Sequence, residues 1–300
     1  MAKFLVTGGA GFIGSNFTKK ALDLGHEVLI LDNLSTGKKE NLDSRAGFAE
    51  VDLCDFEKMN SYFNGIDYVF HFAALPRVPL SIEKPRETNR NNIESTLNVL
   101  IAAKDAKVKR IVYSSSSSAY GRQAVMPLKE DMLPAPINPY AVQKYIGEHY
   151  VRTFYDLFGL EGVGLRYFNV YGPNMSFDGA YTTAVAAFIK QRKDNQPLTI
   201  FGDGEITRDF TFVDDVVEAN LKAAMSEKAG HAEVINIGAG VTHSVNKVAS
   251  LIGGEKVYLE PRKGDARNSL ADISKAKELL GWEPKVQLEE GIQRLKGIYL

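Results

Sequence analysis

Short apolar runs alternate with longer amphipathic segments through the first half of this chain. The runs lack helical periodicity, which is typical of buried strands, and they lie at residues 3–7, 27–31, 48–52, 67–71, 110–114 and 162–168. Between them, apolar residues recur every three or four positions, as in helices with one buried face, at residues 13–24, 86–107 and 138–158. The alternation predicts an α/β fold in which a parallel sheet carries helices on both faces.

The second half of the chain is less regular. After about Tyr171, glycine and proline residues interrupt the pattern, although helical segments are readable at residues 182–192, 214–225, 244–251 and 273–280. The apolar run at residues 234–237 is typical of a buried strand that returns to the sheet. We therefore expect a first domain at residues 1–170 with a return segment near 211–238, and a smaller C-terminal α/β substrate domain at residues 171–300.

A glycine-rich stretch at residues 8–14 follows the first predicted strand and opens the first predicted helix. Asp32 ends the second strand, 18 residues after Gly14. Strand, glycine turn, helix, strand and acid in this order are the fingerprint of a Rossmann-type, doubly wound, dinucleotide-binding fold. The glycines let the backbone approach a pyrophosphate, and the helix N-terminus attracts its negative charge. Because a carboxylate at Asp32 would bind the adenosine ribose and repel a 2′-phosphate, NAD is predicted rather than NADP.

Five consecutive serines, residues 114–118, end a predicted strand and precede Tyr140 and Lys144. Tyr140 and Lys144 are four residues apart, so a helix places them on one face. A lysine ammonium beside a phenol lowers the pKa of the phenol from about 10, which makes it a usable base. Because an ordinary amphipathic helix can carry the same spacing by chance, the catalytic interpretation of the pair depends on the glycine turn at the other end of the chain. Together they predict that a proton is removed from a hydroxyl group beside a dinucleotide.

Composition narrows the class of protein. The chain has 300 residues, 44% of them hydrophobic, and a net charge of −1, so it has no basic excess for binding nucleic acid. No apolar stretch is long enough to span a membrane and no basic, apolar leader opens the chain, so we expect no membrane span and no signal peptide. Cys54 is the only cysteine, which fits a reducing cytoplasm, and the five histidines lack metal-ligand spacing, so no metal is expected.

These motifs in combination resemble the extended short-chain dehydrogenases/reductases, and among them the nucleotide-sugar epimerases of the UDP-glucose/UDP-galactose 4-epimerase type. The resemblance covers essentially the whole chain. The motifs that carry it are residues 7–14, 52–53, 71–74, 114–121, 140–144, 166–169, 208–210 and 262–265. The resemblance implies an NAD-dependent enzyme that inverts C4 of a UDP-hexose through a 4-keto intermediate.

The resemblance also implies roles for single residues. Ser116 would be the catalytic serine, Tyr140 the base and Lys144 its partner. The implied cofactor-binding residues are Gly8, Gly11, Phe12, Ile13, Gly14, Asp32, Asn33, Ser35, Gly37, Asp52, Leu53, Phe72, Ala73, Ala74, Asn92, Ser114, Tyr140, Lys144 and Tyr167. The implied substrate-binding residues are Ser116, Tyr140, Asn169, Thr199, Phe201, Arg208, Arg262, Asp265 and Ser269.

Within the implied substrate site, Arg208 and Arg262 would clamp the diphosphate and Asp265 would hold the nucleotide ribose. Planar guanidinium groups are suited to phosphate oxygens, which agrees with this assignment.

Two departures from relatives refine the expected reaction. Related 4,6-dehydratases and decarboxylases carry an acid two or three residues before the tyrosine that stands here as Tyr120, whereas this chain has Ser118 and Ser117. Epimerisation is therefore favoured over elimination or decarboxylation. Some relatives carry a bulky tyrosine four residues after the aspartate that matches Asp265, where this chain has Ser269. The smaller side chain predicts room for an N-acetyl group, so UDP-GlcNAc and UDP-GalNAc are expected substrates beside UDP-Glc and UDP-Gal.

Three alternatives stay open. A UDP-glucuronate 4-epimerase on the same scaffold would need a cation for the C6 carboxylate, and Arg77 is a candidate. A nucleotide-sugar reductase would consume NADPH, against which Asp32 argues. A non-catalytic NAD-binding protein is the remote alternative. The helices at residues 86–107 and 138–158 form an intersubunit bundle in the resembled family, so a homodimer is expected.

Overall fold

The structure is a computed structural model that describes residues 1–76, 78–177, 183–261 and 268–300. Its described residues contain a seven-stranded sheet in which every neighbouring pair is parallel. The strands are β1 (Lys3–Thr7), β2 (Glu27–Asp32), β3 (Gly47–Glu50), β4 (Tyr68–His71), β5 (Arg110–Ser116), β6 (Glu161–Tyr167) and β11 (His231–Ile237). Their order is β3-β2-β1-β4-β5-β6-β11, so the sheet grows in opposite directions from β1. The predicted doubly wound α/β fold is confirmed.

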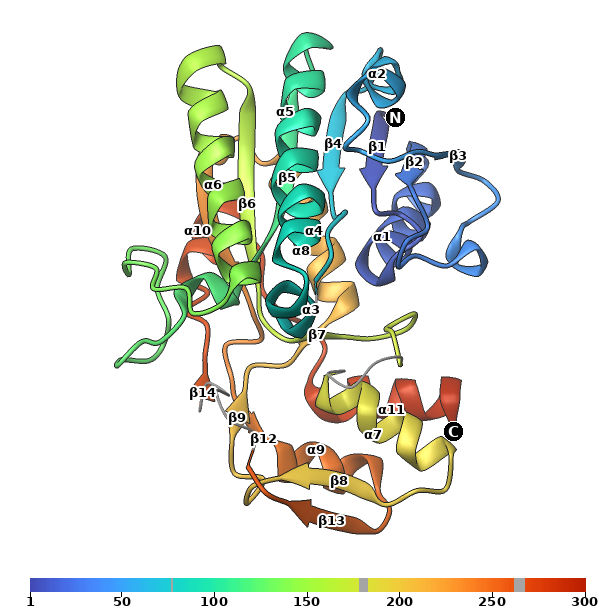
Figure 1. The fold of residues 1–300 in the computed structure, drawn as a ribbon, viewed down its shortest axis with the longest axis vertical. Coiled ribbons are helices and arrows are strands. Elements are labelled where there is room, and N and C mark those ends of the chain that lie inside the picture. The colour runs from blue at the N-terminus through green and yellow to red at the C-terminus, as the bar shows by residue number, and fades with distance from the viewer. Residues whose placement is uncertain (77, 178–182, 262–267) are drawn as a thin grey trace.

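Helices lie around the sheet, and further helices lie beside the short strands of the C-terminal half (Figure 1). The helices are α1 (Phe12–Asp23), α2 (Phe56–Met59), α3 (Val78–Glu83), α4 (Pro85–Asn89), α5 (Ser95–Asp105), α6 (Pro139–Phe158), α7 (Ala184–Lys193), α8 (Val213–Met225), α9 (Val245–Ile252), α10 (Ser274–Leu280) and α11 (Leu288–Tyr299). Shorter turns are η1 (Lys39–Asn41), η2 (Asn60–Phe63), η3 (Arg90–Glu94) and η4 (Ser117–Tyr120).

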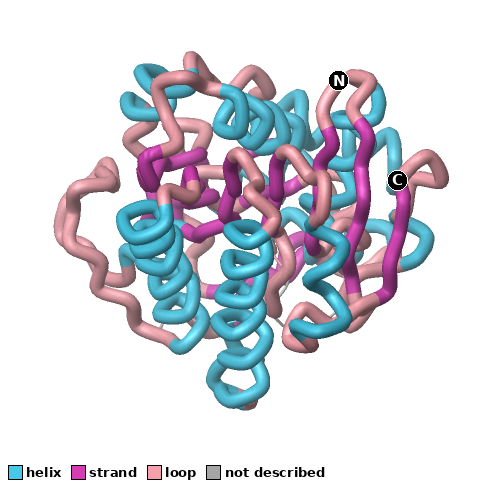
Figure 2. Tube along the Cα trace, turned by 90° about the horizontal axis from the view of Figure 1, so that it is seen from above, coloured by secondary structure: helices cyan, strands magenta, loops and turns pink. Residues whose placement is uncertain are grey.

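The sheet lies between two hydrophobic cores, and Figure 2 shows helices on both of its sides. Side chains alternate across β1: Phe4 and Val6 enter the core shared with α1 and α8, whereas Leu5 enters the core shared with α5 and α6. Because β1, β4 and β6 are buried on both faces along most of their length, these strands are largely apolar, which explains why their sequences lack a two-residue period.

The predicted helix at residues 86–107 is three helical segments in succession. The π-helical segment η3 joins α4 to α5, and such bulges often occur at functional sites. Here it carries Asn92, which is buried and hydrogen-bonds the main chain of Leu75 and the side chain of Gln143. The first helix, predicted at residues 13–24, ends at Asp23, and Leu24 is 53% exposed where the chain turns away.

The C-terminal half adds pairings that the sequence pattern did not predict. β8 (Leu198–Phe201) pairs in parallel with β13 (Lys256–Leu259), and helix α11 packs near α7 and α9. Short strands complete this half: β7 (Val170–Tyr171), β9 (Thr207–Arg208), β10 (Thr211–Phe212), β12 (His243–Ser244) and β14 (Asn268–Ser269). β9 lies between β12 and β14, which places segments distant in sequence side by side.

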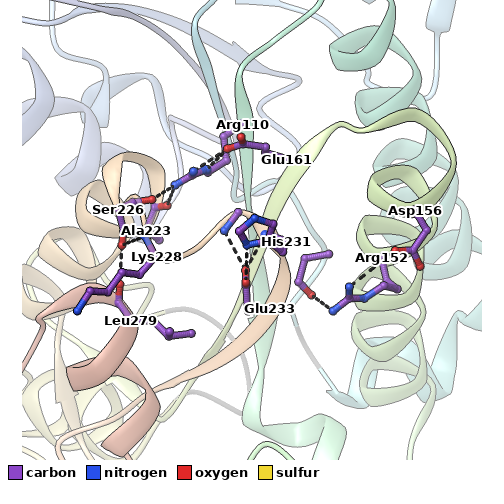
Figure 3. Close-up of polar contacts among 12 residues, drawn as sticks. Arg110, Arg152, Asp156, Glu161, Ala223, Ser226, Lys228, His231, Glu233 and Leu279 are labelled. Carbon is purple, nitrogen blue, oxygen red and sulfur yellow. Dashed lines mark hydrogen bonds and ion pairs between the residues drawn. The ribbon is translucent and has the colours of Figure 1, made fainter.

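The two halves of the chain are interleaved. Strand β11 comes from the second half, yet it pairs with β6 at the edge of the sheet. Arg110, at the start of β5, donates to the Glu161 carboxylate at 2.6 and 2.9 Å and to the main-chain oxygens of Ala223 and Ser226 at 2.9 and 2.7 Å (Figure 3). A guanidinium there binds the carbonyl end of α8 and joins it to the sheet. Where one domain ends and the next begins stays a prediction.

Candidate active site

A cavity of about 1280 Å³ lies beyond the carboxyl ends of the sheet strands and has walls from both halves of the chain. In Figure 1 the arrows of β1 and β4 point towards the elements of the C-terminal half. Of the predicted site residues that the structure describes, all line this cavity except Asn92. Arg77, Arg262 and Asp265 lie outside the described residues.

The glycine turn leaves no room for side chains. A Cβ added to Gly8, whose φ is +71°, would lie 2.7 Å from the main-chain nitrogen of Ala73. A Cβ on Gly14 would lie 2.3 Å from the main-chain oxygen of Gly8. The turn therefore brings bare backbone and the N-terminus of α1 to the cavity, which is the surface that a pyrophosphate needs.

Asp32 stands at the end of β2 with a buried carboxylate. Its Oδ2 accepts from the Ala10 amide at 3.0 Å and its Oδ1 from the Leu34 amide at 2.8 Å. Burial raises the pKa of Asp32, and these two hydrogen bonds oppose the rise. A Cβ on Gly37 would lie 3.0 Å from Asp32 Oδ2, so the loop after β2 closes tightly around the acid. The glycine turn and Asp32 together fit the adenosine and pyrophosphate of a dinucleotide.

A buried histidine holds the loop on the other side of this crevice. His71 Nδ1 lies 2.7 Å from Thr7 Oγ1, and His71 Nε2 lies 2.9 Å from Thr96 Oγ1. Because the Thr96 hydroxyl donates to the Asn92 oxygen at 2.7 Å, it accepts from His71, which assigns the ring proton to Nε2. Burial lowers the pKa of His71 to about 3, so the ring is neutral. Thr7 Oγ1 also accepts from the Ala73 amide at 3.3 Å, so the network positions the loop that borders the cavity.

The three predicted catalytic residues meet in the middle of the cavity. Ser116 ends β5, and Tyr140 and Lys144 stand one turn apart near the start of α6. Asn138 caps that helix by accepting from the Ala141 amide at 2.9 Å, so the helix begins where Tyr140 must stand. Lys144 Nζ donates to the Ser114 main-chain oxygen at 2.6 Å, which ties α6 to the end of β5.

Burial dominates the titration of this trio. It raises the pKa of Tyr140 to about 12, and a hydrogen bond from Ser116 opposes the rise. Burial lowers the pKa of Lys144 to about 7, while the negative charge of Glu148 opposes that fall. Without a bound cofactor, the pKa of Tyr140 therefore lies above that of a free phenol, because desolvation of the phenolate dominates. The effect of the Lys144 ammonium on the phenol during the reaction stays a prediction.

A buried ion pair lies behind the trio. Arg166 donates from Nε and Nη2 to the two carboxylate oxygens of Glu148 at 2.9 and 2.8 Å, and both side chains are less than 5% exposed. Ser115 donates to the same carboxylate, and the guanidinium stacks 4.4 Å above the ring of Tyr120. The Tyr120 hydroxyl donates to Asn236 of β11 at 2.7 Å. The pair thus connects α6, β5, β6 and β11. Glu148 was not predicted. Its position one turn after Lys144 on the same helix face is the sequence feature that could have identified it.

The substrate side of the cavity is organised by Asp209. Its fully buried carboxylate accepts from the amides of Ala239, Gly240 and Ala271 at 2.6, 3.0 and 3.1 Å. Burial raises its pKa to about 6, and these hydrogen bonds oppose the rise. Three amide donors from two segments explain why this part of the chain folds over the end of the sheet.

Asn169 and Ser269 lie in direct contact on this side. Asn169 Nδ2 donates to the Asp209 main-chain oxygen at 3.0 Å and to Ser269 Oγ at 3.2 Å. The pairing of β9 with β14 sets Arg208 opposite Ser269, and Thr199 and Phe201 line the cavity nearby. Of the predicted substrate residues that the structure describes, Thr199, Phe201, Arg208 and Ser269 line the cavity from the C-terminal half together with Asn169, whereas Ser116 and Tyr140 line it from β5 and α6.

The cavity also has apolar walls that were not predicted. Ile82 of α3, Met126 and Ile137 line it from loops around the catalytic helix, and Phe188 lines it from α7. Phe188 lies in a helix that the sequence pattern predicted, but neither it nor the other three residues belong to a motif that would place them in the cavity.

Other chemistry receives no support from the residues that the structure describes. Among them, no group of three or more histidine, cysteine, aspartate or glutamate side chains could hold a metal ion. No described helix has the length and apolar character needed to cross a membrane. Burial raises the pKa of Cys54 to about 12, so its thiol is not a nucleophile at neutral pH.

A comparison with known protein families identifies the class of protein. The profile of the NAD dependent epimerase/dehydratase family matches residues 4–238. The chain belongs to this family. The predicted family, its enzymatic character and its NAD cofactor are confirmed.

Individual relatives cover nearly the whole chain. The crystal structure of UDP-glucose 4-epimerase with UDP-glucose from Thermotoga maritima has 43% sequence identity and a TM-score of 0.94, and the match covers 99% of this chain and 98% of that one. The UDP-glucose 4-epimerase of Mycolicibacterium smegmatis is 36% identical, over 97% of this chain and 96% of its own. UDP-glucuronic acid 4-epimerase from Bacillus cereus, in complex with UDP-glucuronic acid and NAD, has 36% identity and a TM-score of 0.88, covering 99% of this chain and 100% of that one.

The lowered pKa of Lys144 predicts a pH-dependent stability. The pKa of this lysine is 10.5 in a model compound and about 7 in the folded protein, so between these values the unfolded chain binds one more proton. Stability therefore rises with pH in this window, by at most about 4 kcal/mol over three pH units. We expect the free energy of unfolding of the nucleotide-free wild type to rise relative to Lys144→Met between pH 7 and 10.

Denaturant unfolding of both proteins at several pH values measures this difference. Lys19→Met, which removes an exposed lysine of α1, is the matched control and should follow the wild type. A constant gap between wild type and Lys144→Met across the window would contradict the assignment.

Proposed function

We propose that this protein interconverts the C4 epimers of a UDP-hexose, with UDP-Glc and UDP-Gal as substrates. The observation that carries the proposal is the convergence of Ser116, Tyr140 and Lys144 in one cavity with the glycine turn and Asp32. A proton acceptor for a hydroxyl group thus lies in the same cavity as a surface suited to a dinucleotide. UDP-glucose 4-epimerases among the relatives support the same reaction.

Different residues of the chain would perform different parts of this reaction. Bound NAD supplies a reversible hydride acceptor for C4 of the sugar. Tyr140 Oη takes the proton of the 4-hydroxyl, and the Lys144 ammonium favours the phenolate that this requires. Ser116 donates a hydrogen bond to the oxygen that becomes a ketone. Burial raises the pKa of Tyr140 to about 12, and the positive charges of Lys144 and of an oxidised nicotinamide would together lower it towards neutral pH.

Substrate recognition is proposed for the wall opposite the glycine turn. Arg208 would bind the diphosphate, together with Arg262 beyond the described residues, and Asp265 would hold the ribose. Asn169 would contact the diphosphate or the sugar. A substrate anchored by its nucleotide leaves the 4-keto sugar free to turn and present its opposite face.

A first experiment tests the reaction itself. Purified protein without added cofactor is incubated separately with UDP-Gal, UDP-GalNAc and UDP-glucuronate, and products are followed by NMR. We expect conversion of UDP-Gal to its C4 epimer, and a loss of at least about 10²-fold in kcat for Tyr140→Phe, because the base is removed. Near-normal turnover by a folded, NAD-loaded Tyr140→Phe protein would refute the role of Tyr140. No conversion of any substrate, even with NAD supplied, would refute the proposed function.

Substrate size is proposed to depend on Ser269. Its side chain lines the cavity and accepts from Asn169, and it occupies far less volume than a tyrosine ring. We expect wild type to accept UDP-GalNAc, and Ser269→Tyr to lose about tenfold or more in kcat/KM for UDP-GalNAc relative to UDP-Gal, because the ring fills the space of the N-acetyl group. Ser269→Ala, which keeps the space, is the control. Equal losses for both substrates would count against this role.

A UDP-glucuronate 4-epimerase is the second candidate. The Bacillus cereus relative bound to UDP-glucuronic acid favours it, and Arg77 remains the candidate cation for the C6 carboxylate. The same substrate panel decides between the two, since the glucuronate would then be the faster substrate. The confirmed class of enzyme removes the non-catalytic alternative.

A second copy of the chain is proposed to cover α5 and α6. These helices pack side by side (Figure 1), and apolar side chains on them stay partly exposed: Leu97, Ile101, Val142 and Ile146. We expect a homodimer of the 33.1 kDa chain in light scattering at micromolar concentration, and dissociation by Val142→Glu because a charge would be desolvated there. Leu133→Glu, in an exposed loop, is the control. A wild-type monomer would overturn the proposal.

The lack of cysteine pairs also leads us to propose a cytoplasmic location.

A further inference from the structure

The serine that ends β5 is held by its neighbour two residues on. Ser116 Oγ lies 2.5 Å from Ser118 Oγ, and the Ser118 amide donates to Ser116 Oγ at 3.2 Å. Ser118 belongs to η4, whose first turn Ser116 caps. Both hydroxyls line the cavity, and both serines are half-buried. Ser118 thus makes two contacts with the oxygen atom on which the proposed chemistry depends.

The hydrogen-bonding capacity of a hydroxyl decides what these contacts do. A serine oxygen accepts two hydrogen bonds and donates one. The Ser118 amide fills one acceptor position of Ser116. When the Ser118 hydroxyl also donates to Ser116 Oγ, it fills the second acceptor position of that oxygen. The Ser116 hydroxyl can then only donate a hydrogen bond to a further group. Ser116 would then act as a pure donor.

The direction of that donated bond matches the need of the site. Ser116 and Tyr140 line the same cavity, and a hydrogen bond from Ser116 to Tyr140 lowers the pKa of the phenol against the effect of burial. The proposed reaction needs a donor at this place, because negative charge develops on the substrate oxygen beside Tyr140. A serine free to rotate would spend part of its time accepting instead.

We propose that Ser118 is a positioning residue that holds the Ser116 hydroxyl as a hydrogen-bond donor to the reacting oxygen. The inference rests on the proposed function and deepens it, since it assigns a role to a residue that does not itself touch the reacting atoms. It also explains why a hydroxyl, and not simply a small side chain, stands at this position.

Isosteric substitutions provide the test. Ser118→Thr keeps the hydroxyl, and Ser118→Val has the same shape without it, so both share any packing effect. We expect Ser118→Val to lower kcat about ten- to hundredfold with little change in KM, because a misdirected donor weakens stabilisation of the transition state. Ser118→Thr should retain most of the wild-type kcat. Equal activity of the two variants would overturn the proposal.

Ser117→Ala is the matched control within the same run. Ser117 lines the cavity, but within the described residues its hydroxyl makes no hydrogen bond, so this variant should stay within about twofold of wild type. NAD content and melting temperature of each variant show whether it is folded and loaded. A loss in Ser117→Ala as large as that in Ser118→Val would point to a general effect of the serine run and overturn the specific role of Ser118.

A double-mutant cycle separates positioning from direct substrate contact. If Ser118 acts through Ser116, Ser118→Val costs nothing further in a Ser116→Ala background. Additive losses would mean that Ser118 contacts the substrate independently, which overturns the proposal. The assay of the wild type on the substrate panel distinguishes failure of the proposed function from failure of this inference. An inactive wild type refutes the proposed function. An active wild type together with a Ser118→Val variant of normal kcat refutes only this inference.

Discussion

The hydrogen bond from the buried Lys144 ammonium to the Ser114 main-chain oxygen, 2.6 Å long, is the contact on which the arrangement of the site depends. A buried cation is costly unless it is hydrogen-bonded, so this lysine holds α6 tightly against the end of β5. Once the helix is placed, Tyr140 follows one turn earlier and Ser116 two residues further along the strand. The reactive groups therefore come from two rigid elements and not from loops.

The ion pair of Glu148 and Arg166 supports the same junction from behind. Its members belong to α6 and β6, and the Ser115 hydroxyl of β5 joins them. Glu148 also lies close enough to Lys144 to raise its pKa against the effect of burial. The carboxylate is thus part of the fold and at the same time helps to keep the lysine charged.

The C-terminal half closes the cavity through contacts between short, distant segments. Asp209 binds amides that follow β11 and β14, and Asn169 binds Asp209 and Ser269. None of these segments could form a stable unit alone, because each has only a few residues and few apolar side chains. Their position depends on the sheet, into which the second half sends β11.

Much of the fold and of the site could be predicted because it follows from local properties of the chain. Apolar runs located the sheet strands, the glycine turn located one end of the cavity, and helical spacing put Tyr140 and Lys144 on one face. The pairing of β8 with β13 could not be predicted, since 54 residues separate Phe201 from Lys256 and neither short strand has a sequence feature that identifies the other as its partner. The sequence by itself determined which groups this protein has for its chemistry. Only the tertiary structure decided their protonation, because packing of α6 against β5 buries both groups, which raises the pKa of Tyr140 and lowers that of Lys144.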